Sequence, residues 1–544
     1  MDTIAEMVRA RADDDSVALR FADESLTYRE WVQHCADRAA LWASLRDDAK
    51  PPHIGVLLDN VADFTMWLGA AALTGSTVVG INPTRRGEEL AHDVRHTECQ
   101  IIVTESSYRG LFDGLDLGVR DDRVFDIETA AYADLVGEFR GAALPSEPAE
   151  PSTRFLLLFT SGTSGAPKAV ICTQGRLASV CASMIGVVGL TADDVTYISM
   201  PLFHSNALFT GWAPSVAAGA TVALRRKFSA SEFLPDVRRF GATYFNYVGK
   251  PLAYVLATPA QSDDHDYPLV RGFGNEANES DLRGFAERFG CRLIDGYGQT
   301  ETGASIVRVP DMPAGALGMA APSVKILDPV TGEECPRALF DEHGRLLNAV
   351  EATGEIVNTG GTTFEGYWNN PEAEAERMRH GAYWTGDLGY RDDAGFFYFA
   401  GRTADWLRVD GENFAAAPVE RILSRFAGVV LCAVYGVPDP LAGDVVMVAL
   451  QLTAPFHPDD FAEFLGSQPD LGPKWVPSFV RVVDRLPMTQ TNKVVKRQLV
   501  TERWSTADPM WKRSPDGGYR AFTEADSEAL LGEFRRHGRE GLLS

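Results

Sequence analysis

The sequence lacks any pair of closely spaced cysteines. Its seven cysteines are scattered along the chain, none falls in a Cys-x-x-Cys arrangement, and an odd number cannot all pair with one another. Structural zinc sites usually place cysteines in such close pairs, and a disulfide framework usually contains an even number of cysteines. We therefore expect reduced thiols and no structural zinc. The cysteines are Cys35, Cys99, Cys172, Cys181, Cys291, Cys335 and Cys432.

A surplus of positive charge is also absent. The 544 residues include 75 acidic and 51 basic side chains, which gives a net charge of −24 at pH 7. A surface of this sign repels phosphate backbones, so we expect no nucleic-acid partner. A site for a nucleotide would have to be built from local positive charge. The length suffices for more than one domain with a sizeable core.

Long hydrophobic runs are missing as well. The most apolar stretch, residues 66–81, is too short to span a bilayer and is interrupted by three glycines. The first six residues lack the basic region of a secretory signal peptide. Together these absences predict a cytoplasmic protein with no transmembrane segment.

Apolar runs alternate with segments of helical periodicity through the first hundred residues. Residues 54–58 and 101–104 read as buried strands, whereas residues 61–75 and 87–95 read as helices. A capping box opens a further helix over residues 27–45. This alternation predicts βαβ units and an α/β fold with a mainly parallel sheet. Residues 106–140 are weakly patterned and carry no helix or strand prediction.

A stretch rich in glycine and hydroxyl groups follows the apolar run 155–159. It reads Thr-Ser-Gly-Thr-Ser-Gly-Ala-Pro-Lys over residues 160–168. Glycines let backbone N–H groups approach an anion, and the hydroxyls and Lys168 add donors and charge, as a polyphosphate cradle requires. It is not a Walker A loop, which needs Gly-Lys-Ser/Thr in direct succession. A flexible linker is the alternative, but a linker needs neither a preceding strand nor a terminal Pro-Lys.

This stretch resembles the phosphate loop of the adenylate-forming superfamily, which contains acyl-CoA synthetases, luciferases and peptide-synthetase adenylation domains. Further matches are Gly-Asn-Glu at 274–276, Asp-Gly-Tyr-Gly-Gln-Thr-Glu at 295–301 and Thr-Gly-Asp at 385–387. Residues 227–254 and the Arg408 to Asn413 stretch resemble the fatty-acid transport and very-long-chain acyl-CoA synthetase branch. The chain also looks like actinobacterial ligases that activate fatty acids or steroid side-chain carboxylates. The likeness extends over residues 20–500.

The resemblance implies which residues bind ATP. Those bordering adenine follow strands of the sheet, where open α/β sheets hold ligands, and Tyr297 would stack on the base. Asp387 and Arg402 would contact the ribose. The implied nucleotide-binding residues are Thr160, Ser161, Gly162, Thr163, Ser164, Gly165, Lys168, Gly274, Asn275, Glu276, Asp295, Gly296, Tyr297, Gly298, Thr300, Asp387 and Arg402.

The resemblance also implies the catalytic groups. Glu301 and Thr160 would hold Mg²⁺, a hard cation that takes carboxylate and phosphate oxygens. Thr300 would contact the α-phosphate, and His204 would line the passage from the acyl pocket. A lone histidine is otherwise often a satisfied core residue. Lys493, in Met-Thr-Gln-Thr-Asn-Lys over residues 488–493, corresponds to the catalytic lysine of the superfamily.

The implied architecture is a large N-terminal domain of layered sheets and helices, residues 1–404, and a small mobile α+β domain, residues 405–544. Asp405 corresponds to the hinge, and Arg408 and Gly411 to the coenzyme A tunnel. Strands over 429–434 and 445–452 and helices near 416–425 and 458–467 support the α+β assignment.

The predicted function is an ATP-dependent acyl-CoA synthetase that forms an acyl-adenylate and then a thioester. Its substrates would be ATP, coenzyme A and a long-chain or very-long-chain fatty acid, or a steroid side-chain carboxylate, with Mg²⁺ as cofactor. Two alternatives stay open: an adenylation enzyme that serves a carrier protein, and a non-catalytic lipid-binding or transport protein. A homodimer and peripheral membrane contact also stay open.

Overall fold

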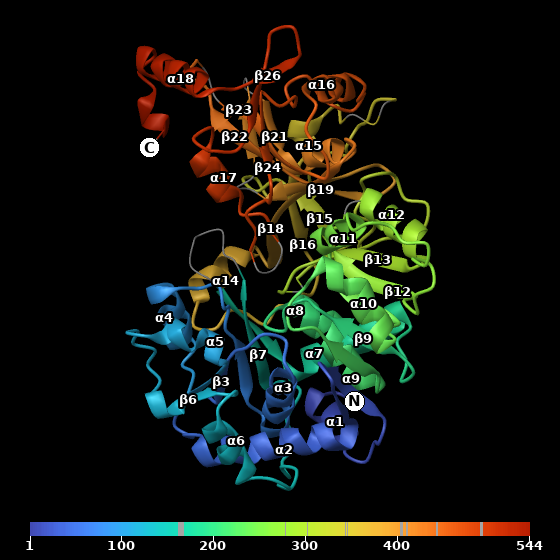
Figure 1. The fold of residues 1–544 in the computed structure, drawn as a ribbon, viewed down its shortest axis with the longest axis vertical. Coiled ribbons are helices and arrows are strands. Elements are labelled where there is room, and N and C mark those ends of the chain that lie inside the picture. The colour runs from blue at the N-terminus through green and yellow to red at the C-terminus, as the bar shows by residue number, and fades with distance from the viewer. Residues whose placement is uncertain are drawn as a thin grey trace. The chain divides into compact units, whose positions relative to one another are not determined.

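The computed structural model forms two compact units (Figure 1). It describes residues 1–160, 168–277, 279–301, 303–342, 344, 346–402, 406–409, 412–441, 444–489 and 493–543, without the side chains of residues 402, 406, 408, 412, 413 and 415. The first unit comprises Met1–Ala277, Leu282–Gly303 and Thr363–Glu376, and the second comprises Asn278–Asp281, Ala304–Thr362 and Arg377–Ser544. The predicted boundary between residues 404 and 405 falls outside the described residues and stays a prediction.

One sheet of the first unit carries the start of the predicted phosphate loop. Its order is β6-β5-β3-β4-β7-β8, and all neighbours are parallel except β7 and β8. The predicted parallel sheet is therefore confirmed, whereas the antiparallel strand after the loop was missed. The strands are β3 His53–Leu57, β4 Thr77–Gly80, β5 Ile101–Thr104, β6 Val124–Asp126, β7 Arg154–Thr160 and β8 Lys168–Thr173.

A second sheet of this unit runs in the order β13-β12-β11-β9-β10-β1-β2, parallel except for the β1–β2 hairpin. The sequence placed Asp295 to Gly298 after a strand, but they lie inside β13. Ladder bonds to β12 extend the strand as far as Asp295. The strands are β1 Val17–Phe21, β2 Glu24–Thr27, β9 Val195–Ile198, β10 Thr221–Leu224, β11 Tyr244–Val248, β12 Arg271–Asn275 and β13 Arg292–Gly298.

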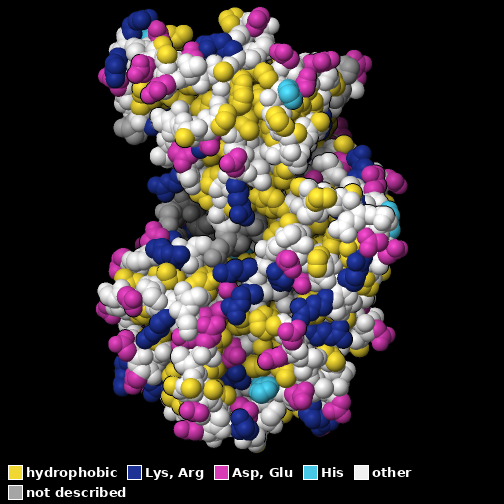
Figure 2. All heavy atoms as spheres, viewed as in Figure 1, with side chains coloured by type: hydrophobic (Ala, Val, Ile, Leu, Met, Phe, Trp, Pro, Cys, Tyr) yellow, Lys and Arg dark blue, Asp and Glu magenta, His cyan; other side chains and the backbone are white. Residues whose placement is uncertain are grey.

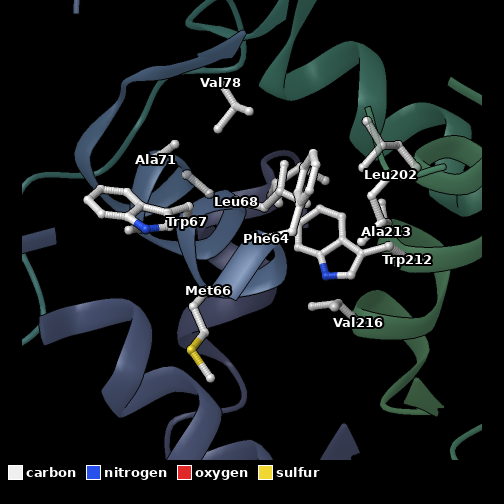
Figure 3. Close-up of a cluster of buried hydrophobic side chains, with 14 of the residues drawn as sticks. Phe64, Met66, Trp67, Leu68, Ala71, Val78, Leu202, Trp212, Ala213 and Val216 are labelled. Carbon is white, nitrogen blue, oxygen red and sulfur yellow. The ribbon is translucent and has the colours of Figure 1, made fainter. Parts of the chain in front are cut away.

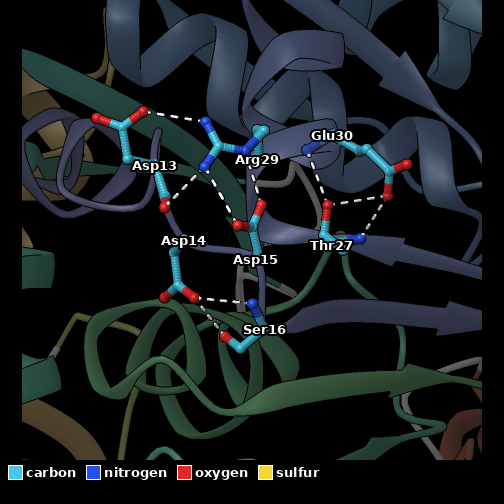
Figure 4. A network of polar contacts seen from close by, with 7 residues as sticks. All are labelled: Asp13, Asp14, Asp15, Ser16, Thr27, Arg29 and Glu30. Atoms are coloured by element: carbon cyan, nitrogen blue, oxygen red, sulfur yellow. Dashed lines mark hydrogen bonds and ion pairs between the residues drawn. The ribbon is translucent and has the colours of Figure 1, made fainter.

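The predicted capping box opens helix α2 (Tyr28–Leu45). Thr27 Oγ1 accepts from the Glu30 N–H at 3.2 Å, and the Thr27 N–H donates to Glu30 Oε2 at 2.8 Å (Figure 4). These reciprocal bonds satisfy two backbone donors that a helix start otherwise leaves open. Arg29 adds bonds to Asp13 and Asp15, so the preceding loop is tied to the first turn.

Helix α3 (Ala62–Thr74) is buried between other elements of the first unit. Figure 3 shows Phe64 and Trp67 on this helix among core side chains that include Trp212 and Leu202. Such all-round burial explains why the helix is apolar on every side. Other helices are α1 Ile4–Arg9, α4 Gly87–His96, α6 Ala130–Gly137, α7 Gln174–Val188, α8 Ser205–Ala207, α9 Ala213–Ala218, α10 Ala230–Phe240, α11 Gly249–Leu256, α12 Glu279–Phe289 and α14 Pro371–Arg377.

The second unit contains two larger sheets and a two-stranded ribbon. One sheet has the order β15-β16-β18-β17 with β19 on β18, and the other has the order β22-β23-β24-β25-β26. The strands are β15 Val324–Leu327, β16 Gly354–Asn358, β17 Met378–Arg379, β18 Ala382–Arg391, β19 Phe397–Arg402, β20 Trp406–Val409, β21 Glu412–Ala415, β22 Val429–Pro438, β23 Asp444–Leu452, β24 Phe479–Val483, β25 Met510–Arg513 and β26 Tyr519–Ala521.

The helices near the C-terminus agree with the predicted α+β region. They are α15 Ala416–Leu423, α16 Pro458–Gly466, α17 Lys496–Glu502 and α18 Glu524–Arg536. Within the described ranges, no helix combines the length and the apolar character needed to cross a membrane. Acidic and basic side chains are intermingled on the face shown in Figure 2, so the negative net charge is spread rather than concentrated there.

Candidate active site

The two ends of the predicted phosphate loop meet across an antiparallel strand pair. β7 ends at Thr160, β8 begins at Lys168, and these two residues are partners in the ladder. The loop between them, including Ser161, Gly162, Thr163, Ser164 and Gly165, lies outside the described residues. The ladder nevertheless places the hydroxyl and the lysine that flank the loop side by side.

Lys168 is a buried cation. Its side chain is 4% exposed, and Nζ lies 2.9 Å from Glu376 Oε2 on α14. The ammonium also lies 5.6 Å from the centre of the Tyr367 ring. A cation with so little contact with water interacts strongly with any anion that reaches it. Lys168 therefore has the burial and the charge expected of the predicted phosphate contact, and that role stays a prediction.

Glu301 lies close to the same tyrosine. Its Oε1 accepts from the Tyr367 hydroxyl at 2.9 Å and is 3.5 Å from Thr160 Oγ1, and the residue is 6% exposed. A carboxylate beside a hydroxyl is a hard-oxygen pair that suits Mg²⁺. Among the described residues no group of three or more His, Cys, Asp or Glu could hold a metal. The Glu301 carboxylate and the Thr160 hydroxyl suit an ion that completes its shell with phosphate oxygens.

Thr300 is held at both its side chain and its backbone. Its hydroxyl lies 2.8 Å from the Ser205 hydroxyl, and its carbonyl accepts from the buried guanidinium of Arg176. Arg176 also donates to the Ile171 carbonyl of β8 at 2.7 Å. One arginine thus joins the strand after the phosphate loop to the Thr300-Glu301 segment.

The predicted adenine-binding residues gather at the ends of β12 and β13. Asp295 Oδ2 accepts from the Tyr247 hydroxyl at 3.3 Å, and Asn275 Oδ1 accepts from Asn206 at 3.1 Å. At Gly274 a Cβ atom would collide with the Tyr247 carbonyl of the neighbouring strand. Glu276, directly after β12, has a φ of 65°, a left-handed conformation found at turns and functional sites. The remaining predicted members, Gly296, Tyr297 and Gly298, lie in β13.

His204 lies directly before α8, half-buried beside Phe203, with 5.8 Å between the two ring centres. Ser205, the residue after it, is the partner of Thr300. His204 is therefore next in the chain to Ser205, which contacts Thr300, the residue predicted to bind the α-phosphate. Its contact with a substrate stays a prediction.

The second unit holds the predicted ribose residues and the lysine. Asp387 is buried in β18 and is the ladder partner of Arg402 on β19. The Thr-Gly-Asp segment lies within β18, where Gly386 takes a φ of 72°. Lys493 is half-buried, and its N–H donates to Thr489 Oγ1 at 3.0 Å. Asp405 and Gly411 lie outside the described residues, as do the side chains of Arg402 and Arg408.

Several residues around these groups were missed by sequence reasoning. A Gly-Tyr-Trp-Asn-Asn run at 366–370, which leads into α14, was the available signal for Tyr367. Glu376, Arg176 and Ser205 carry no local pattern that sets them apart from ordinary surface residues. Burial raises the pKa of the Cys172 thiol on β8 to about 12.

Comparisons with known proteins identify the family of the chain. Residues 7–368 match the AMP-binding enzyme family, and residues 418–493 match its C-terminal domain. The chain belongs to the AMP-binding enzyme family. The fold agrees, because a benzoate CoA ligase from Burkholderia xenovorans LB400 superimposes with a TM-score of 0.78 over 92% of this chain and all of the other, at 19% identity. That likeness shows the fold alone.

Relatives of this AMP-binding enzyme indicate its reaction class. It is 51% identical to the steroid-22-oyl-CoA synthetase of Rhodococcus jostii (strain RHA1), over 99% of each chain. It is 48% identical to the medium/long-chain-fatty-acid–CoA ligase FadD17 of Mycobacterium tuberculosis, over 94% of this chain and 98% of the other. The predicted family and the predicted class, an acid–thiol ligase, are confirmed.

Proposed function

We propose that this protein is an ATP-dependent ligase that joins coenzyme A to the side-chain carboxylate of a steroid. The observation that carries the proposal is the 51% identity, over nearly the full length of both chains, to a steroid-22-oyl-CoA synthetase. Medium-chain or long-chain fatty acids are the second candidate class, supported by the 48% identity to a fatty-acid–CoA ligase. The implied substrates are thus a carboxylic acid, ATP and coenzyme A.

In the first half-reaction a carboxylate oxygen attacks the α-phosphorus of ATP and pyrophosphate leaves. Nucleophile and electrophile are both anionic, so the barrier is largely electrostatic. Lys168, from the end of the phosphate loop, and Lys493 would offset the charge that develops on the phosphates. Thr300 would orient the α-phosphate, and Glu301 with Thr160 would hold Mg²⁺, which would screen the phosphate charge. Asp387 and Arg402 would fix the ribose, and His204 would line the passage to the acyl group.

In the second half-reaction the coenzyme A sulfur attacks the acyl carbon of the acyl-adenylate and AMP leaves. We propose a domain boundary between residues 404 and 405, with Asp405 as the hinge. Rotation there would withdraw Lys493 and bring Arg408 and Gly411 beside the pantetheine arm, a hinge motion of a known kind.

A panel of carboxylic acids with ATP, Mg²⁺ and coenzyme A tests the proposal. We expect thioester formation with steroid side-chain acids at a kcat/KM at least about tenfold above that of medium-chain and long-chain fatty acids. The reverse order would favour the second candidate. Adenylate formation without coenzyme A turnover would indicate a carrier-protein acceptor. Lack of pyrophosphate release with every acid would support the non-catalytic alternative.

We place the enzyme in the cytoplasm, because buried free thiols such as Cys35, Cys99 and Cys181 suit a reducing compartment. The same compartment supplies ATP and coenzyme A. Homodimer formation and membrane contact remain alternatives that size-exclusion chromatography and vesicle co-sedimentation would decide.

A further inference from the structure

Tyr367 is held rigidly against the strand that follows the phosphate loop. Its backbone forms an antiparallel bridge with Val170 of β8, and the Trp368 N–H donates to the Ala169 carbonyl at 2.8 Å. The side chain is buried and packs with Val170 and Ala373. A ring fixed on both sides can orient the groups that contact it.

The hydroxyl and the aromatic ring of Tyr367 contact side chains of opposite charge. The hydroxyl donates to Glu301 Oε1 at 2.9 Å, whereas Lys168 Nζ lies 5.6 Å from the ring centre. The carboxylate that pairs with the Lys168 ammonium is Glu376 and not Glu301, with Glu376 Oε2 2.9 Å from Nζ. Glu376 is 63% exposed, so a phosphate oxygen can replace it at a small cost in desolvation.

A second tyrosine in the first unit shows the alternative arrangement. Tyr132 donates to Asp63 Oδ1 at 2.7 Å, and the Arg38 guanidinium lies 5.9 Å from the centre of its ring. In that group, however, the cation and the carboxylate bind each other directly, with Arg38 Nη2 2.6 Å from Asp63 Oδ1. Such a pair has a structural role, because the two charges neutralise each other.

We propose that Tyr367 is a positioning residue that keeps the Glu301 carboxylate and the Lys168 ammonium apart. It holds the carboxylate by its hydroxyl and offers the ammonium its ring face, so each charge stays available for the nucleotide. Without it, a buried lysine and a buried glutamate this close to one ring would pair and neutralise each other. The inference rests on the proposed function, because it assumes that Glu301 serves Mg²⁺ and Lys168 serves phosphate.

Calorimetric titration with ATP, in Mg²⁺ and separately in EDTA, tests the inference. Tyr367→Phe removes only the hydroxyl, so we expect binding of ATP with Mg²⁺ to weaken roughly 3- to 10-fold, the worth of one hydrogen bond. Binding of ATP in EDTA should stay within about twofold of the wild type, since the ring beside Lys168 remains. Equal weakening in both titrations, or no weakening in either, would overturn the proposal.

The matched control is Tyr132→Phe, which removes a buried phenol–carboxylate bond from the Arg38–Asp63 group. It should lower the melting temperature and leave both ATP titrations unchanged. Glu376→Gln supplies a second test at an exposed position. It should tighten ATP binding in EDTA and leave the gain from Mg²⁺ intact, whereas a diminished gain would mean that Lys168 had collapsed onto Glu301. A wild-type protein whose ATP binding ignores Mg²⁺ would instead contradict the proposed function.

Discussion

At the scale of single residues, the first unit separates its charges by unequal exposure. Lys168 and Glu301 are buried, whereas Glu376, the partner of the lysine, is largely open to solvent. A buried charge interacts more strongly with a ligand than an exposed one, because less water screens it. The two buried charges are therefore the ones whose removal should affect nucleotide chemistry most.

Lys493→Ala tests the proposed role of this lysine in adenylation. We expect the rate of acyl-adenylate formation to fall by at least ~10², because one charge that stabilises the transition state is lost. Thioester formation from pre-made acyl-adenylate should be largely spared. Pyrophosphate release and thioester yield measure the two steps, and Lys325→Ala, on β15, is the control. Equal losses in both steps would remove Lys493 from the role assigned to it.

Glu301→Gln tests the proposed metal ligand while keeping an oxygen that can accept from Tyr367. Loss of the charge should raise the Mg²⁺ concentration needed for half-maximal adenylation about tenfold, with partial rescue by excess metal. Single-turnover adenylation over a Mg²⁺ series gives this value. A metal dependence identical to that of the wild type would show that Glu301 does not bind the ion.

At the scale of elements, β11, β12 and β13 bring the predicted adenine-binding residues together at their ends. Parallel strands end at one edge, so residues far apart in the chain, such as Tyr247 of β11 and Asp295 of β13, become hydrogen-bond partners there. The close approach of β11 and β12 depends on a missing side chain at Gly274. This edge is therefore sensitive to small changes in volume.

Gly274→Ala should destabilise the first unit by ~1–3 kcal/mol, because the new Cβ atom would overlap the Tyr247 carbonyl. The substitution should also weaken ATP binding, since β12 must shift at the edge that carries the predicted adenine-binding residues. Thermal unfolding and calorimetric titration give the two values. Gly298→Ala in β13 is the control, because a Cβ atom there meets nothing within 4 Å. Its melting temperature should match that of the wild type, and a similar fall in both variants would contradict the steric argument.

At the scale of the whole molecule, the proposed chemistry requires one chain to present two different sets of residues in turn. In the proposed mechanism Lys493 would serve only the first half-reaction, and Gly411 would serve only the second. The proposed hinge at Asp405 would satisfy both needs, because a change in a few backbone dihedrals there would move everything after residue 405.

Asp405→Pro should stop this exchange, because proline locks φ near −65° and restricts the preceding residue. If the arrangement that makes the adenylate is the one retained, pyrophosphate and acyl-adenylate should form in a single turnover and no thioester should follow. Both products are measured in one sample, with Asp405→Ala as the control that keeps backbone freedom. Normal thioester turnover by the proline variant would show that the chain does not pivot at this residue.

The sequence by itself was sufficient for the elements whose local signals are strong. The α2 capping box and the alternating apolar runs of β3 and β5 predicted those elements closely, because capping and periodicity are properties of neighbouring residues. The motifs likewise identified the family. The segment 106–140 stayed without a prediction, and it forms short pieces such as β6 and α6. Their residues are weakly patterned because few of them are buried.

Only the tertiary structure decided which side chains surround the predicted site residues. Tyr367 reaches Glu301 and Lys168 through a β-bridge to Val170, a contact between segments almost two hundred residues apart. The Arg176 side chain likewise donates to the carbonyl of Thr300, a residue far away in the sequence. No local sequence pattern predicts such contacts, because they depend on the order of the strands within the sheets and on which side chains that order buries. The family motifs could therefore be recognised from the sequence alone, whereas the contacts of Tyr367 with Glu301 and Lys168 depend on the fold.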